Sequence, residues 1–273
     1  MSKKRLDELL VERDLVESKD KAQRLIMAGL VLSDQNRLDK PGMQVDEKIP
    51  LKIKQKKKAY VSRGGLKLEK AIKSFNLSLD NRILVDIGSS TGGFTDCALQ
   101  NGVKLSYAID VGYNQLDWKL RNDERVLVME RTNFRYVTKD MFSSGEPSFA
   151  SIDVSFISLK LIFPVLKNLL AKDNDVVALI KPQFEAKKVQ VGEGGIVRDK
   201  TIHFEVLEKT IQFAAKEGFE LQGLTYSPIT GGQGNIEFLS HFKYKENGVT
   251  EKPSLNLLDV IDNAHGNLLG QNN

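Results

Sequence analysis

The chain has 273 residues, of which 28% are charged and 41% hydrophobic, an ordinary composition for a soluble protein with one sizeable α/β domain and a small appendage. Its single cysteine, Cys97, excludes an internal disulfide and favours a reducing, cytoplasmic location. Charges interrupt the apolar residues near the N-terminus, so we expect neither a secretory signal nor a membrane span.

The positive charge of the chain is concentrated at its start. Residues 1–60 contain 15 Lys and Arg against 10 Asp and Glu, whereas the other 213 residues contain 25 against 26. A basic module fused to a nearly neutral body is suited to electrostatic attachment to nucleic acid. A merely solvated charged face has the same composition, so charge alone leaves both interpretations open.

Residues 1–58 are predicted to form a small α+β domain. Apolar residues at helical spacing predict a helix over residues 5–15, and Ser18 stands at the N-cap of a second helix that ends at Gly29. Short β patterns with turn residues between them follow as far as residue 53. Two helices and a few short strands in about 55 residues bury little surface. We therefore interpret this part as an accessory module.

The spacing in this module resembles the S4 RNA-binding family. The resemblance rests on Arg5-Leu-Asp and on residues 18–31, which read Ser-x-x-x-Ala-x-x-Leu-Ile-x-x-Gly-x-Val. That family docks two helices against structured RNA through exposed Arg and Lys. The resemblance implies phosphate contacts by four cations: Arg5, Lys19, Lys21 and Arg24. An ordinary helical hairpin with surface lysines is the alternative.

A basic run, Lys52, Lys54 and Lys56–Lys58, leads into the segment 59–65, which we predict to be a linker. The run either extends a phosphate track or is simply solvated. Helical periodicity returns at residues 66–75, and from residue 83 strand and helix patterns alternate. Strands are predicted at residues 83–86, 105–110, 126–129, 149–153, 175–180, 219–225 and 236–242. Helices are predicted from residue 94 and at residues 159–170 and 203–217.

Continuously apolar strands that alternate with helices indicate a mostly parallel sheet with both faces covered. We therefore predict one α/β domain over residues 66–245. Beyond it, residues 246–273 form a polar tail in which only residues 255–261 have a helical pattern.

A glycine-rich stretch, Asp86-Ile-Gly-Ser-Ser-Thr-Gly-Gly-Phe94, follows the first of these strands. As a P-loop it lacks the essential lysine, since position 94 is Phe, and its glycine spacing does not fit the G-x-G-x-x-G of dinucleotide folds. The same turn is typical of S-adenosylmethionine methyltransferases, where small residues let the backbone approach the cofactor. The predicted cofactor contacts in this stretch are Asp86, Gly88, Ser89, Ser90, Thr91, Gly92, Gly93 and Phe94.

Asp110 ends the second predicted strand of this domain. A carboxylate at that place can accept both ribose hydroxyls of the cofactor, as the acidic residue of dinucleotide folds does. A solvent-exposed carboxylate at a strand end is the alternative, and the glycine-rich loop before it favours the cofactor contact.

Four charged residues interrupt apolar segments elsewhere in the domain: Lys67, Asp153, Lys181 and Glu237, called the tetrad below. Strand ends of such a sheet gather at one edge, and buried charges are costly unless they are paired. We therefore expect the four residues to meet as two pairs of opposite charge. Any one of them alone would equally suit a structural ion pair.

The order Lys, Asp, Lys, Glu resembles the tetrad of FtsJ-like ribose 2′-O-methyltransferases. With the S4-like module in front, residues 3–245 resemble the TlyA or haemolysin A family of ribosomal RNA 2′-O-methyltransferases. The segments that carry this resemblance are Tyr60-Val-Ser-Arg-Gly-Gly, Asp153-Val-Ser-Phe-Ile-Ser and Lys181-Pro-Gln-Phe-Glu. It implies a Rossmann-like methyltransferase domain with a seven-stranded, mostly parallel sheet. It also implies S-adenosylmethionine as cofactor, and ribosomal RNA or ribosomal subunits as partner, with a cytidine as substrate.

The chemistry explains why these residue types are needed. A ribose 2′-OH is a poor nucleophile, and transfer from a sulfonium needs an in-line approach that positioning supplies. A lysine whose pKa is lowered by burial and a neighbouring cation can orient or accept the hydroxyl proton, and we assign this role to Lys181. Asp153, which we also count among the cofactor contacts, would fix Lys181, while Lys67 and Glu237 orient the nucleotide and the amine. Asn133 stands where relatives have an adenine-contacting Asp, which weakens its assignment to the cofactor.

Two further arginines complete the predicted RNA contacts. Arg63 lies in the linker, and Arg198 lies in the glycine-containing segment 189–199, which is either a substrate-facing loop or a flexible connector. His203, His241 and His265 are widely separated in the sequence and lack ligand spacing, so we expect no metal.

Two other functions compete with RNA methylation. One is a membrane-active cytolysin, but the sequence has no amphipathic membrane helix or long apolar segment. The other is a non-catalytic RNA-binding ribosome factor, against which the glycine-rich loop and the complete tetrad argue. The sequence carries no signal for the oligomeric state.

Overall fold

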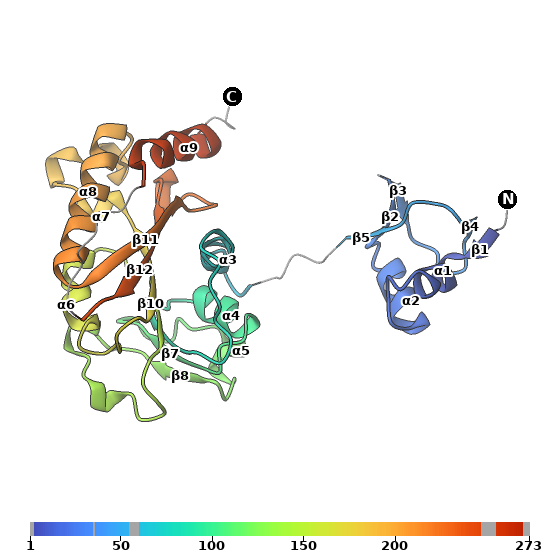
Figure 1. Ribbon diagram of the computed structural model, residues 1–273, viewed down its shortest axis with the longest axis horizontal. Coiled ribbons are helices and arrows are strands. Elements are labelled where there is room, and N and C mark those ends of the chain that lie inside the picture. The colour runs from blue at the N-terminus through green and yellow to red at the C-terminus, as the bar shows by residue number, and fades with distance from the viewer. Residues whose placement is uncertain (1–2, 35, 55–59, 247–254, 270–273) are drawn as a thin grey trace. The chain divides into compact units, whose positions relative to one another are not determined.

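A computed structural model describes residues 3–34, 36–54, 60–246 and 255–269 (Figure 1). The chain divides into two compact units, residues 1–59 and 60–273, here called the N-terminal and the C-terminal unit. Lys56, Lys57 and Lys58 of the predicted basic run lie outside the described residues.

The N-terminal unit packs two helices against short antiparallel strands. Its elements are β1 (Lys3–Arg5), α1 (Leu6–Glu12), α2 (Lys19–Met27), β2 (Val31–Ser33), β3 (Asn36–Leu38), β4 (Gln44–Asp46) and β5 (Lys52–Ile53). Strand β1 pairs with β4, and β2 pairs with β3 and β5. Leu6, Leu10 and Ile26 are fully buried between the helices. Helix α1 is shorter than predicted because Asp14 adopts a positive φ of 53°, which a right-handed helix does not allow.

The predicted start of α2 is present in the structure. Ser18 has an extended backbone, and its side chain accepts a hydrogen bond from the amide of Lys21 at 3.3 Å. This bond satisfies one of the amides that the first helical turn leaves without a partner.

The C-terminal unit is built on a seven-stranded sheet among its described residues, with strand order β11-β12-β10-β9-β6-β7-β8. The strands are β6 (Ile83–Ile87), β7 (Leu105–Ile109), β8 (Val126–Met129), β9 (Phe149–Ile152), β10 (Asp175–Ile180), β11 (Phe219–Tyr226) and β12 (Phe238–Tyr244). Strands β6 to β10 are parallel, whereas β12 is antiparallel to both β10 and β11. The predicted seven-stranded, mostly parallel sheet is therefore confirmed.

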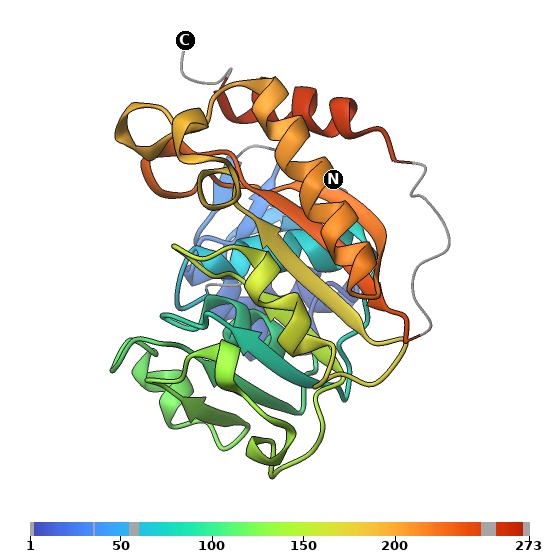
Figure 2. The same cartoon turned by 90° about the vertical axis from the view of Figure 1, so that its left-hand side faces the viewer.

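Helices cover both faces of this sheet. They are α3 (Gly64–Ser74), α4 (Gly93–Gln100), α5 (Trp118–Arg121), α6 (Phe163–Leu166), α7 (Pro182–Glu185), α8 (Lys200–Lys216) and α9 (Leu257–Leu269). Single 3₁₀ turns are η1 (Phe134–Tyr136), η2 (Lys139–Met141), η3 (Leu159–Leu161), η4 (Lys188–Gln190), η5 (Glu193–Gly195) and η6 (Gly232–Gly234). Figure 2 shows α8 lying across one face of the sheet.

Alternation along the strands separates two cores. In β6, Val85 belongs to the core under α6, α8 and α9, whereas Leu84 belongs to the core under α3, α4 and α5. Successive side chains of a strand point to opposite faces, so one continuously apolar strand serves both cores. The run of apolar residues in each strand is thereby explained.

Three parts of the C-terminal unit differ more clearly from the sequence prediction. The helix expected at 159–170 is divided into η3 and α6, with Pro164 in the first turn of α6, where its missing amide proton costs nothing. Residues 60–65, predicted as a linker, belong to the C-terminal unit, and α3 begins at Gly64. The predicted polar tail contains α9, whose Ile261 and Ala264 are buried in the same core as α8.

Candidate active site

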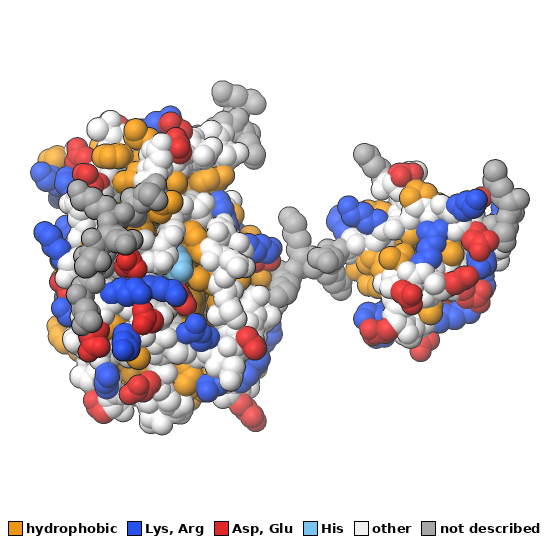
Figure 3. Space-filling model, viewed as in Figure 1, with side chains coloured by type: hydrophobic (Ala, Val, Ile, Leu, Met, Phe, Trp, Pro, Cys, Tyr) orange, Lys and Arg blue, Asp and Glu red, His pale blue; other side chains and the backbone are white. Residues whose placement is uncertain are grey.

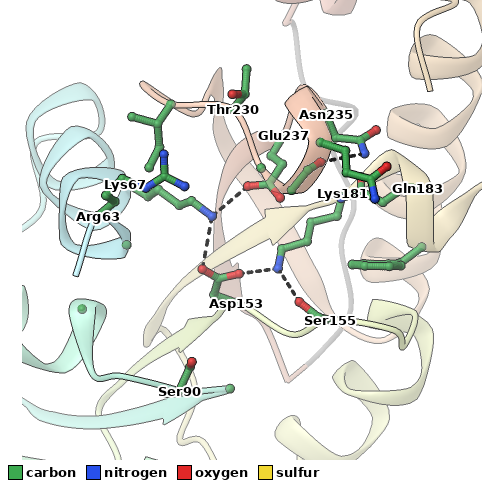
Figure 4. Close-up of a pocket in the computed structure, with 18 of the residues that line it drawn as sticks. Arg63, Lys67, Ser90, Asp153, Ser155, Lys181, Gln183, Thr230, Asn235 and Glu237 are labelled. Atoms are coloured by element: carbon green, nitrogen blue, oxygen red, sulfur yellow. Dashed lines mark hydrogen bonds and ion pairs between the residues drawn. The ribbon is translucent and has the colours of Figure 1, made fainter. Parts of the chain in front are cut away.

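The four tetrad residues come together at one edge of the sheet (Figure 4). Asp153 follows β9 and Lys181 follows β10, and neighbouring parallel strands end side by side. Strand β12 runs the other way, so its first residue, Phe238, pairs with Ile180 and brings the preceding Glu237 to the same edge. Lys67 reaches this edge from the first turns of α3.

The tetrad forms a continuous chain of alternating charges. Lys181 Nζ lies 2.6 Å from Asp153 Oδ1, and Lys67 Nζ lies 3.4 Å from Asp153 Oδ2 and 2.8 Å from Glu237 Oε2. The four side chains are only 3% to 18% exposed. The sequence predicted two separate pairs, but Asp153 is shared by both lysines and joins them.

These contacts set the charge state of two members. Burial alone would lower the pKa of Lys67, but the carboxylates of Asp153 and Glu237 outweigh it and raise that pKa. Burial alone would raise the pKa of Asp153, but Lys181 and Lys67 outweigh it and lower that pKa. Both residues are therefore charged at neutral pH, as a buried ion network requires.

A pocket of about 650 Å³ lies over the tetrad, a volume typical of small-molecule sites. All four tetrad residues line it. So do six predicted cofactor contacts besides Asp153: Gly88, Ser89, Ser90, Thr91, Gly93 and Phe94. Gly88 has a φ of +84°, and a Cβ there would lie 2.5 Å from the Asp153 carbonyl oxygen. Only glycine therefore lets the loop pass this close to the tetrad.

Asp86, predicted as a cofactor contact, lies beneath the loop instead of in the pocket. Its Oδ2 accepts from the amide and hydroxyl of Thr95 at 3.1 and 2.7 Å, and its Oδ1 accepts from Ser151 Oγ at 2.7 Å. Burial raises the pKa of Asp86 to about 6, against the opposing effect of these hydrogen bonds. Asp86 therefore ties the start of α4 to two strands and shapes the loop from below.

Three other predicted cofactor residues do not line the pocket and make contacts elsewhere. Asp110 Oδ2 accepts from the Ser90 amide at 2.8 Å, which fixes the loop to the end of β7. Gly92 has a φ of +95° and packs against Leu120 in α5. Asn133 Oδ1 accepts from the amide of Arg135 at 3.1 Å and so caps η1.

The predicted RNA contacts of the N-terminal unit are engaged with carboxylates or backbone. Arg5 makes a two-point contact with the buried Asp7, at 3.0 and 2.8 Å. Lys19 pairs with Glu8 and Lys21 with Glu17. Arg24 donates to the carbonyl of Asp20 at 3.3 Å. Figure 3 shows Lys and Arg interspersed with Asp and Glu on one face of this unit.

Both predicted arginines of the C-terminal unit are exposed. Arg63 lines the main pocket beside Lys67 (Figure 4). Arg198 lines a second, smaller hollow formed by residues 190–202. Residues 191, 194 and 195 of the glycine-containing segment line the main pocket, so this segment faces the tetrad.

Several pocket residues were not singled out from the sequence. Ser155 Oγ lies 3.1 Å from Lys181 Nζ. Phe156 is 90% exposed with a φ of 64°, and its ring centroid lies 5.1 Å from that of Phe184. Asn235 is 3% exposed and lines the pocket, two residues before Glu237 of the tetrad. Ser155 and Phe156 stood inside a segment used for the family resemblance, but no spacing rule assigns them a contact.

The histidines are closer in space than in sequence. His203 Nδ1 lies 3.0 Å from His265 Nε2, and His241 Nε2 lies 2.8 Å from Asp175 Oδ1. Over the described ranges, no three His, Cys, Asp or Glu side chains gather as metal ligands would. Within the same ranges, no helix has the length and apolar character to cross a membrane.

Two known protein families match parts of this chain. Residues 60–244 match the FtsJ-like methyltransferase family, and residues 4–48 match the S4 domain. YqxC of Bacillus subtilis is 59% identical over 268 residues, which are 97% of this chain and 95% of YqxC. Hemolysin A of Brachyspira hyodysenteriae is 44% identical over 238 residues, 87% of this chain and 99% of that protein. The Mycobacterium tuberculosis protein named 16S/23S rRNA (cytidine-2′-O)-methyltransferase TlyA is 40% identical over 235 residues, 86% of this chain and 87% of TlyA.

Proposed function

This chain belongs to the FtsJ-like methyltransferase family, and we propose that it transfers a methyl group from S-adenosylmethionine to the 2′-OH of a cytidine in ribosomal RNA. The observation that carries this proposal is the tetrad, a chain of alternating charges that lines a pocket beside the glycine-rich loop. The name of the TlyA relative supports the choice of substrate.

The loop between β6 and α4 fits S-adenosylmethionine. Gly88 lets the backbone pass close to Asp153, and Ser89, Ser90 and Thr91 border the pocket. Asp110 holds the Ser90 amide and lies at the end of the next strand, where such folds receive a ribose. The bound cofactor supplies an electrophilic methyl group on a sulfonium. The residues of the chain bind and orient the cofactor and the nucleotide, and one of them accepts the proton of the ribose hydroxyl.

Lys181 is the group that we assign to the proton of the ribose hydroxyl. Asp153 Oδ1 and Ser155 Oγ hold its Nζ at 2.6 and 3.1 Å, so the amine is fixed at the pocket surface. Asp153 is itself held by Lys67, whose second carboxylate partner is Glu237. Positioned groups of this kind raise the rate by removing the entropy cost of alignment. In its neutral form Lys181 accepts the proton as the ribose oxygen takes the methyl group, and Asp153 then pairs with the ammonium that forms.

The N-terminal unit supplies the RNA contact in this proposal. It matches the S4 domain, and residues 1–60 carry the positive excess of the chain. Contacts between cations and phosphates give affinity that does not depend on sequence, while the pocket selects the nucleotide. Ribosomal RNA or a ribosomal subunit is therefore the proposed partner, and the cytoplasm the proposed location.

The proposal is tested by transfer of labelled methyl from S-adenosylmethionine to ribosomal RNA. We expect incorporation with the wild-type protein and almost none with Lys181→Ala. Lys209→Ala, which removes an exposed lysine of α8, serves as the matched control and should retain activity. Full activity of Lys181→Ala would show that the assigned role is wrong. One relative is named Hemolysin A, but nothing in the geometry of the pocket favours membrane activity, so we do not propose it.

A further inference from the structure

One wall of the pocket consists of two glycine-containing loops, residues 191–197 and 229–235, called the wall loops below. Asn235 joins them: its Oδ1 accepts from the Val197 amide at 3.0 Å, and its Nδ2 donates to the Gly195 carbonyl at 3.0 Å. The loops also approach each other directly, because a Cβ on Gly194 would lie 2.9 Å from Gln233 Oε1. Figure 4 shows Asn235 on the same side of the pocket as Glu237 and Lys181.

A buried histidine supports the wall loops from behind. His203, near the start of α8, is fully buried, and its Nε2 lies 3.1 Å from the carbonyl oxygen of Val197. The same ring stands edge-on to Phe238, the residue that follows Glu237, with centroids 5.4 Å apart. Val197 is thus held twice, through its amide by Asn235 and through its carbonyl by His203.

The hydrogen bonds determine where the proton of His203 lies. A carbonyl oxygen only accepts, so Nε2 of His203 carries the proton and its Nδ1 accepts from His265 Nε2, 3.0 Å away. Burial lowers the pKa of His203 to about 4 and also lowers that of His265. Both rings are therefore neutral at neutral pH, and the direction of these hydrogen bonds is fixed.

His265 is in turn fixed by the packing of α9. Ile261 and Ala264 on this helix are buried in the core that α8 and the sheet share. An exposed pair between Lys200 and Asp262, at 2.5 Å, adds a second contact between α8 and α9. The position of His265 thus depends on how α9 packs on the sheet core. A continuous series of contacts leads from that core through His265 and His203 to Val197 in the wall loops.

We propose that His203 and His265 are positioning residues that transmit the placement of α9 to the wall loops, which bind the RNA segment around the target ribose. The inference rests on the proposed function, because it assigns the substrate side of that same pocket. It gives the C-terminal helix a part in substrate binding, although α9 contributes no residue to the pocket lining described above.

Two substitutions at position 203 separate positioning from mere stability. His203→Ala removes both hydrogen bonds, whereas His203→Gln keeps a donor for Val197 and an acceptor for His265. Val206→Ala, one turn further along α8 and buried in the same core, is the control for a general loss of packing. The readouts are methyl transfer at varied RNA concentration, calorimetric binding of S-adenosylmethionine, and hydrogen exchange of the backbone amides of residues 191–198.

We expect His203→Ala to raise the KM for RNA about tenfold, a size typical of a misplaced binding group, while kcat and cofactor affinity change little. Exchange at residues 191–198 should rise with it. His203→Gln should remain close to wild type in both. Equal effects of His203→Ala and Val206→Ala on KM, or unchanged exchange at 191–198, would overturn the proposal.

Two further results are informative if His203→Ala does not fold or if the protein methylates no RNA. If His203→Ala does not fold, His265→Ala takes its place, because this ring is only half-buried; a rise of about threefold in KM is expected and no rise contradicts the proposal. If the wild-type protein methylates no RNA, the proposed function fails. The exchange data then still decide whether His203 anchors the wall loops.

Discussion

Lys181 Nζ lies 2.6 Å from Asp153 Oδ1, across the ends of the neighbouring parallel strands β10 and β9. The other oxygen of Asp153 faces Lys67. One carboxylate therefore pairs with two largely buried lysines, and of the two only Lys67 has a second carboxylate partner in the tetrad, Glu237. The arrangement makes Asp153 important for both stability and activity.

Asp153→Asn should reduce both properties. Removal of one partner from a buried ion network costs about 3 kcal/mol in the free energy of unfolding, and loss of the group that orients Lys181 should slow methyl transfer at least about 100-fold. Chemical denaturation and single-turnover methyl transfer measure these effects. The control is Asp123→Asn, which breaks an exposed pair with Arg125 and should cost less than about 1 kcal/mol. Equal losses in both variants would contradict the assignment.

Asp86 predicts a distinct dependence of stability on pH. Its folded-state pKa of about 6 exceeds the value of about 3.9 in an unfolded chain, so its contribution is complete below pH 4 and is lost as the pH rises through 6. Asp86→Asn keeps the shape without the titration. The unfolding free energy of the variant minus that of wild type should therefore increase by about 3 kcal/mol between pH 4 and pH 8. A difference that stays constant with pH would refute this explanation.

The close approach of the glycine-rich loop to Asp153 is tested at Gly88. Gly88→Ala must relieve both a positive φ and a 2.5 Å contact with the Asp153 carbonyl, so we expect S-adenosylmethionine to bind at least about tenfold more weakly. Gly234→Ala is the matched control, because Gly234 has a similar φ of +89° but nothing within 4 Å of its Cβ position. Calorimetry should show nearly unchanged cofactor affinity for the control. Similar losses in both variants would mean that backbone strain alone matters.

Two cations of the N-terminal unit should behave differently. Lys21 pairs on the surface with Glu17, so Lys21→Gln should leave stability within about 0.5 kcal/mol. It should also lower RNA affinity and reduce the salt dependence of binding by about one ion. Arg5 is bound to the buried Asp7, so Arg5→Gln should lower the melting temperature more than Lys21→Gln does. Binding titrations at several salt concentrations and thermal melts separate the two effects.

The sheet and the charges at its edge followed from the sequence because their signals are local. Apolar runs fix β9 and β10, and a charged residue directly after each run must lie at the carboxyl edge. That Asp153 is shared by two lysines did not follow, since it depends on how α3 places Lys67. The place of Glu237 depends likewise on the antiparallel direction of β12. Asp86 shows the same limit: a residue at the right place in a motif can shape a loop from below without lining the pocket.

The wall loops show a second kind of limit. His203 and His265 are 62 positions apart in the sequence, and only the docking of α9 on α8 brings their rings together. Most residues of the predicted tail are polar, so its sequence did not indicate that Ile261 and Ala264 pack in the core. No pattern of spacing in the sequence contains this contact.

The central claim is that the methyl group goes to a ribose hydroxyl of RNA. Mass spectrometry of nucleosides from ribosomal RNA, treated with the protein and S-adenosylmethionine, tests it most directly. We expect 2′-O-methylcytidine with the wild-type protein and none with Lys181→Ala. Methylation on a base, or 2′-O-methylcytidine formed equally well by Lys181→Ala, would contradict it.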